Sequence, residues 1–160
     1  MGMIGHYIAA DVDIIQQIGD NQLNLLDLES DGYPTLDIDK SWQAIHFLLC
    51  GEIAEGEPPW GFVVPMRQDN LLEDVDMDCG AFALTPQQTR EVYNAIKDIN
   101  EEMLRRRYDF NLLVKNGIYP MFDDENPEGV FGYILEYFQD IREFYKEASQ
   151  YNYGIVFYIM

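Results

Sequence analysis

The last eight residues, YGIVFYIM, constrain the fold of this chain more than any other segment. They form a short continuous apolar run rich in β-branched and aromatic residues, which is typical of a strand buried on both faces. A second strand is predicted at Met3–Ala10, whose residues alternate between two faces. One face carries Ile4, His6 and Ile8, and the other carries Met3, Tyr7 and Ala9. Because helices are predicted between these strands, we expect residues 1–160 to form a single α+β domain. Its small mixed sheet would include the N- and C-terminal strands and be packed by several helices.

Helices are predicted where a capping residue precedes apolar residues at three- and four-residue steps. The clearest start is Thr85, with Pro86 at the first helical position and Gln88 completing a capping box. The longest helix should run from Pro127, capped by Asn126, to about Gln150. The remaining predicted helices are 12–18 capped by Asp11, one capped by Asp37 or Asp39 and stopped by Gly51, 101–107, and a short one capped by Asp109.

Residues 52–80 are predicted to form a long acidic loop system around one strand, Gly61–Met66. This segment contains eight acidic residues and one basic residue, Arg67, so its net charge is −7. Phe82–Leu84 is predicted to be a further strand. The acidic residues are Glu52, Glu55, Glu57, Asp69, Glu73, Asp74, Asp76 and Asp78.

The overall composition argues against several classes of protein. Ten Lys and Arg against 29 Asp and Glu give a net charge of −19, which argues against binding nucleic acid or an anionic membrane surface. With 48% apolar residues the chain can fill a core, yet no apolar run approaches the roughly 18 residues of a membrane span. Two cysteines are too few for a disulfide scaffold, and the N-terminus has no cationic signal-peptide region. We therefore expect a cytoplasmic protein with two reduced thiols.

Two patterns resemble metal or catalytic motifs. Asp74–Gly80 alternates carboxylates as calcium loops do, but glycine stands at loop position 7 instead of 6, and Thr85 occupies position 12. A solvated acidic loop is the preferred interpretation. His46 and Cys50 lie four residues apart on one predicted helix, so they could share a metal ion or act as base and nucleophile. No further ligand completes a site, so we predict no metal, no cofactor and a buried thiol.

Aromatic and basic residues receive structural interpretations first. The stripe Tyr137–Phe144 has the spacing of a core-facing helix, and ligand contact is the alternative. Arg105, Arg106 and Arg107 form the only basic cluster. In so acidic a chain we expect them to pair with the protein's own carboxylates, and recruitment of an anion is the alternative.

Several segments together resemble the YfbM-like family of small bacterial proteins, a domain of unknown function. These segments are MGMIGHYIAAD, LDIDKSWQAIHFLLCG, AFALTPQQ, YDFNLLVKNGIYP and GIVFYIM. The resemblance covers nearly the whole chain and implies a single α+β domain, but it implies no activity and no catalytic residues. The helix pattern of the family ends in Leu-Thr-Gly, where this chain has Leu49-Cys50-Gly51, and this departure argues against a catalytic Cys50.

Two functions remain open. The first is a non-enzymatic acidic binding module that contacts a basic protein, as an inhibitor or immunity-type protein would; its contact residues would be Glu73, Asp74, Asp76 and Asp78. The second is a small-molecule-binding protein or enzyme. Its pocket would lie near His6, Asp37, Asp39 and His46, with Tyr7 and Trp42 as binding residues. Acidity that serves only solubility is the alternative to the first.

Overall fold

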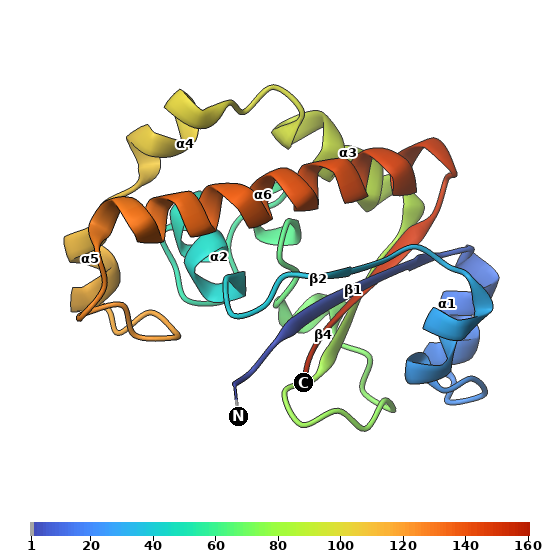
Figure 1. Ribbon diagram of the computed structural model, residues 1–160. Coiled ribbons are helices and arrows are strands. Elements are labelled where there is room, and N and C mark those ends of the chain that lie inside the picture. Colours follow the sequence, from blue (N-terminus) through green and yellow to red (C-terminus); the bar gives the residue numbers. More distant parts are fainter. Residues whose placement is uncertain (1) are drawn as a thin grey trace.

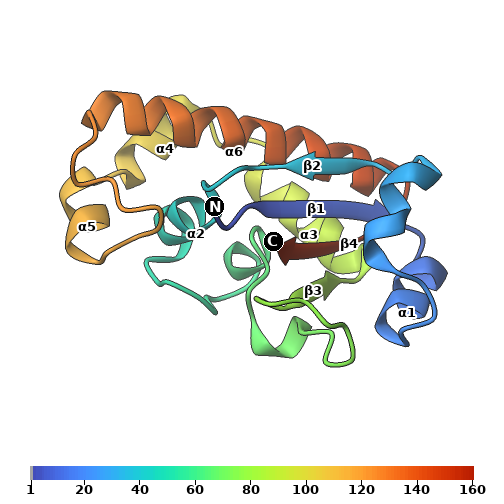
Figure 2. The same ribbon diagram turned by 60° about the horizontal axis from the view of Figure 1, so that its bottom comes forward.

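One four-stranded sheet organises the computed structural model, which describes residues 2–160. The strands are β1 (Gly5–Ala10), β2 (Thr35–Asp37), β3 (Ala81–Leu84) and β4 (Gly154–Ile159), and they lie in the order β2-β1-β4-β3 (Figure 2). All three pairings are antiparallel, so the sheet is not mixed. The chain is a single α+β domain, as predicted.

The two terminal strands pair at the centre of this sheet. β1 and β4 are in register over six residue pairs, from Gly5 opposite Ile159 to Ala10 opposite Gly154. Every residue of β4 is buried, because a strand lies on each side and other elements cover both faces. This confirms the prediction that the apolar terminal run is a doubly buried strand.

The described residues, 2–160, form six α-helices. They are α1 (Val12–Gly19), α2 (Trp42–Cys50), α3 (Pro86–Ile96), α4 (Glu101–Arg107), α5 (Phe110–Lys115) and α6 (Pro127–Gln150). Short 3₁₀ helices occur at Leu25–Asp31, Trp60–Phe62 and Gln68–Asn70.

Three of the predicted helix starts are confirmed in atomic detail, including Asp109, which accepts from the backbone N–H of Leu112 at the start of α5. The Thr85 hydroxyl accepts from the Gln88 backbone N–H, while the Gln88 side chain accepts from the Thr85 N–H. Asn126 accepts from the backbone N–H groups of Glu128 and Gly129 at the start of α6. The predicted cap Asp11 was wrong, since its side chain accepts no hydrogen bond at the start of α1.

The predicted cap of α2 was wrong. This helix begins at Trp42, after Ser41, and neither aspartate caps it. Asp37 instead accepts from the Asp39 N–H, and Asp39 accepts from the hydroxyl of Tyr133 on α6. Tyr133 lies more than ninety positions from Asp39 in the chain, so no local sequence pattern can reveal this hydrogen bond.

The two faces of the sheet are covered by different segments. Tyr7 and Phe157 face a core built by α2, α3 and α6, whereas Ile8 and Val156 face a smaller core under α1, Leu25–Asp31 and the segment that precedes β3. In Figure 1 the long helix α6 lies along one side of the sheet and α1 lies on the other. The predicted stripe of α6 belongs to the larger core and is confirmed there, although Tyr137 is only partly buried.

The predicted strand Gly61–Met66 was wrong. Trp60–Phe62 is a 3₁₀ turn, and Phe62, Val63 and Val64 are buried against the larger core. The carbonyl oxygen of Val63 accepts from the hydroxyls of Tyr7 (2.6 Å) and Tyr145 (2.8 Å). A short β-branched apolar run fits a strand or any other buried segment, and here side-chain hydroxyls satisfy its backbone.

Candidate functional site

Two chain segments without any lysine or arginine cover the same face of the sheet. Residues 11–37 contain α1 and the Leu25–Asp31 helix, and residues 71–80 form the segment before β3. Leucines and valines of both segments pack on the smaller core, and the backbone N–H of Leu72 donates to the Ala81 carbonyl (2.8 Å). We call residues 11–37 and 71–80 the acidic face.

The acidic face carries eleven carboxylates, and all of them are exposed. Within residues 2–160, none of the eleven lies within 4.0 Å of a lysine, arginine or histidine nitrogen. The fold thus gathers negative charge that the chain does not neutralise. The eleven are Asp11, Asp13, Asp20, Asp27, Glu29, Asp31, Asp37, Glu73, Asp74, Asp76 and Asp78.

The remaining acids of the predicted loop system lie elsewhere. Glu55 accepts from the backbone N–H of Gln68 and lies 3.9 Å from the Arg67 guanidinium, which also lies 3.5 Å from Asp69. These residues flank the buried turn at Phe62, on the side of the larger core. The acidic segment predicted as one unit therefore divides between two sides of the sheet.

His6 and Asp37 are brought together by strand pairing. They lie directly opposite each other on β1 and β2. The His6 ring stacks on Tyr158, with ring centroids 5.1 Å apart and planes 20° apart. This pair lies on the sheet face that the acidic face covers, where Tyr158 packs in the smaller core.

Asp39 instead lines a separate cavity of about 400 Å³. Its Oδ2 accepts from the Tyr133 hydroxyl (2.8 Å), which in turn accepts from the backbone N–H of Lys40 (3.1 Å). Burial and the hydrogen bond to Asp39 raise the pKa of Tyr133, so this phenol stays protonated. The other lining residues are Lys40, Pro120, Met121, Phe122, Glu125, Gly129 and Val130. Tyr133 was not predicted from the sequence, because a single tyrosine within an aromatic-rich helix carries no signal of its own.

His46 does not line this cavity. It lies on α2 with no exposed surface, and neither ring nitrogen makes a hydrogen bond of good geometry. Burial lowers the pKa of His46, and the nearby carbonyl oxygens of Ala54 and Val64 offset only part of that effect. A neutral, enclosed imidazole on another element cannot act together with Asp39.

The two predicted aromatic binding residues are structural. Tyr7 is fully buried, and its hydroxyl donates to the Val63 carbonyl. Trp42 donates from Nε1 to the Met3 carbonyl (2.9 Å) and stacks on Tyr119, with ring centroids 5.5 Å apart. Neither lines the Asp39 cavity.

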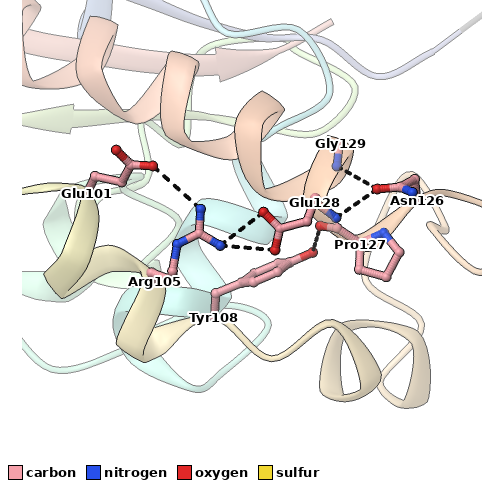
Figure 3. Close-up of polar contacts among 7 residues, drawn as sticks. All are labelled: Glu101, Arg105, Tyr108, Asn126, Pro127, Glu128 and Gly129. Carbon is pink, nitrogen blue, oxygen red and sulfur yellow. Dashed lines mark hydrogen bonds and ion pairs between the residues drawn. The ribbon is translucent and has the colours of Figure 1, made fainter.

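The arginine cluster was predicted to pair with carboxylates of the chain, and two of its three members do so. Arg105 of α4 extends toward the start of α6, where Nη1 is 3.0 and 3.1 Å from the two oxygens of Glu128, and Nη2 is 3.5 Å from Glu101 (Figure 3). Arg106 pairs with Glu102. Arg107 differs, since its guanidinium lies over the Trp60 ring, 5.0 Å from the centroid.

Comparison with known proteins identifies the family. A family model described as a domain of unknown function, DUF1877, matches residues 1–158. The chain belongs to the DUF1877 family. A search of curated proteins found no match. Among solved structures, the chain is similar to the crystal structure of YfbM, a protein of unknown function from Escherichia coli. The TM-score is 0.75 at 22% identity, over 98% of this chain and 99% of the other.

Membership of the DUF1877 family agrees with the predicted resemblance to YfbM-like proteins. The likeness at this identity shows the fold and carries no activity to the present chain. Among residues 2–160, no helix is long and apolar enough to cross a bilayer. The same residues hold no group of three or more His, Cys, Asp or Glu side chains placed to bind a metal ion.

Cys50 is the position at which this DUF1877 chain departs from the expected helix ending. Its thiol is half-buried and unbridged, and burial, with a smaller effect of Glu52, raises its pKa to about 11. A nucleophilic cysteine needs the opposite shift, because the thiolate is the reactive form. This geometry argues against catalysis by Cys50.

We expect the two thiols to react at different rates. At pH 8, iodoacetamide should alkylate the exposed Cys79 well before Cys50, since little of Cys50 is thiolate at that pH. Mass spectrometry of the denatured, unreduced protein should find two free thiols. Equal labelling rates in the folded protein, or a single free thiol in the denatured one, would contradict the assignment.

Proposed function

We propose that this chain is an acidic binding module whose acidic face contacts a basic surface of another protein, as an inhibitor or immunity-type protein does. The observation that carries the proposal is the set of eleven exposed carboxylates on one side of the sheet, without a lysine or arginine among them. Opposite charge accelerates association and selects partners. We further propose that the module acts in the bacterial cytoplasm.

The distribution of positive charge supports this choice of face. Arg105 and Arg106 are paired with their own carboxylates, and Arg67 lies beside Glu55 and Asp69. These pairs are on the side of the larger core. All five ion pairs among residues 2–160 therefore lie outside the acidic face, whose two segments contain no lysine or arginine.

The test compares two variants with the same change in total charge. The face variant carries Glu73→Gln, Asp74→Asn, Asp76→Asn and Asp78→Asn. The control variant carries Glu136→Gln, Asp140→Asn, Glu143→Gln and Glu147→Gln, all exposed on α6 and on the opposite side of the sheet. Each protein is used to capture partners from a host lysate at two salt concentrations, and bound proteins and small molecules are identified by mass spectrometry.

A basic protein should be captured at low salt by the wild type and by the control, and much less by the face variant. Association should slow with salt, because the Debye length falls from about 10 Å at 0.1 M to about 3 Å at 1 M. The proposal would be contradicted if all three proteins captured the same amount of the basic partner, or if capture were equal at both salt concentrations.

A second candidate function, small-molecule binding, is favoured by the Asp39 cavity. Its volume of about 400 Å³ lies within the range of ligand pockets, and three charged residues (Asp39, Lys40 and Glu125), the phenol of Tyr133 and apolar side chains line it. A metabolite extract should then raise the melting temperature of the wild type and leave that of Asp39→Asn unchanged. Equal shifts in both proteins would place the ligand elsewhere.

A further inference from the structure

Two adjoining hollows lie within the acidic face, with volumes of about 370 and 260 Å³. They share three lining residues, Leu26, Asp76 and Met77, which lie where the two hollows meet. We call the two hollows together the Leu26 groove. The first hollow extends to Leu23 and Val75, and the second extends to Ile159 and Met160.

The lining of the Leu26 groove combines accessible apolar side chains with polar ones, which are Asn21, Gln22 and Asn24 in the first hollow and Asp76 in both. Leu26 is 46% exposed and Met160 is 57% exposed. Met3 and Met77 also line the second hollow. Methionine side chains are flexible and polarizable, which suits a surface that must adapt to an apolar partner.

The charges around the groove restrict what can occupy it. Asp76 and Asp78 line it, and neither hollow has a lysine or arginine in its lining. A second copy of this chain would bring one acidic face against another acidic surface, at a cost in repulsion. Anionic lipid and nucleic acid would be repelled in the same way. The complementary occupant is a segment with apolar side chains on one side and lysine or arginine at its edges.

The backbone of the groove favours recognition of a helix. The segment before β3 forms turns, in which the backbone N–H of Val75 donates to Leu72, that of Met77 to Val75 and that of Gly80 to Met77. A segment of turns presents side chains and no extended strand edge, which disfavours strand addition there. An amphipathic helix needs only apolar pockets, because its own backbone bonds are satisfied.

We propose that the Leu26 groove binds the apolar side of a basic amphipathic helix from a partner protein. This inference rests on the proposed function and adds an apolar anchor to the charge of the acidic face. The carboxylates of the acidic face would attract the basic side chains of the partner, and the groove would bind its apolar side chains.

The experiment uses two synthetic peptides of Leu and Lys with the same composition, each about four helical turns long. One places leucine at positions i, i+3, i+4 and i+7, and the other orders the residues so that no apolar side forms. Fluorescence anisotropy at a fixed low salt measures binding to the wild type, to the double variant Leu26→Gln and Met77→Gln, and to Val12→Gln. Val12 is 56% exposed on α1 and lies outside the groove, so it is the matched apolar control.

The amphipathic peptide should bind the wild type and Val12→Gln at least about tenfold more tightly than the reordered peptide, and the double variant should lose this preference. Circular dichroism melts establish that the double variant is folded; Leu26→Gln alone, at an exposed site, gives the same comparison if it is not. Equal affinity for both peptides would overturn the groove and leave the electrostatic proposal standing. The same titrations are repeated at high salt to test the electrostatic proposal. Affinities of both peptides that do not fall at high salt would contradict that proposal. A concentration-dependent dimer of the protein alone, weakened by Leu26→Gln, would identify a second copy as the occupant and overturn the inference.

Discussion

Replacing Ile141 or Phe144 by alanine is expected to lower the free energy of unfolding by roughly 2–5 kcal/mol for each change. Both side chains lie on the buried side of α6, with exposed fractions of 0% and 6%. Phe144 also packs at an angle against Tyr7 on β1, with ring centroids 5.6 Å apart. Each truncation removes apolar contacts and leaves a cavity that a packed core closes only in part.

Urea unfolding monitored by circular dichroism measures both variants. Gln139→Ala is the control, since Gln139 is exposed on the same helix and its replacement should change stability by no more than about 0.5 kcal/mol. Values for Ile141→Ala and Phe144→Ala as small as that of the control would mean that another side of α6 faces the core.

Gly61→Ala is expected to destabilise the protein by roughly 1–3 kcal/mol or more. A Cβ at this position would lie 2.2 Å from the carbonyl oxygen of Gly56 and 3.0 Å from that of Glu55. Both obstacles are backbone atoms, so the loop itself would have to move. Its movement would disturb the turn at Phe62 and Val63, on which the hydroxyls of Tyr7 and Tyr145 depend.

Gly132→Ala is the matched control for this change. Gly132 is exposed on α6, and a Cβ there meets no atom within 4 Å. Because glycine is unfavourable in a helix interior, this replacement should stabilise the protein by roughly 0.5–1 kcal/mol. The same urea measurements apply, and a Gly61→Ala protein as stable as the wild type would contradict the close approach of residues 56 and 61.

The candidate site was only partly predictable from the sequence. Glu73, Asp74, Asp76 and Asp78 were identified from charge density, and they lie exposed on the acidic face. Their proximity to residues 11–37 was not predictable, because the two segments are separated in the chain and meet only across the face of the sheet. For the Asp39 cavity, Asp39 was predicted as a site residue and Tyr133 was not.

Local signals determined most of the elements. Three features depend on interactions within a few residues and could therefore be predicted from the sequence. They are the capping box at Thr85, the start of α6 at Asn126 and the apolar spacing along that helix. The doubly buried terminal strand was also predicted, because apolar residues on both faces are typical of a central strand.

Where a polar group has several possible hydrogen-bond partners, its actual partner depends on tertiary contacts. Asp39 accepts a hydrogen bond from the Tyr133 hydroxyl instead of capping α2. The apolar run at Phe62–Val64 forms a buried turn, and the hydroxyls of Tyr7 and Tyr145 donate to its carbonyl groups. The tertiary structure also decided that the acids of residues 52–80 divide between two sides of the sheet. The physical reason is the same in each case: a carboxylate or a carbonyl binds the best donor within reach, and distant donors come within reach only when the chain has folded.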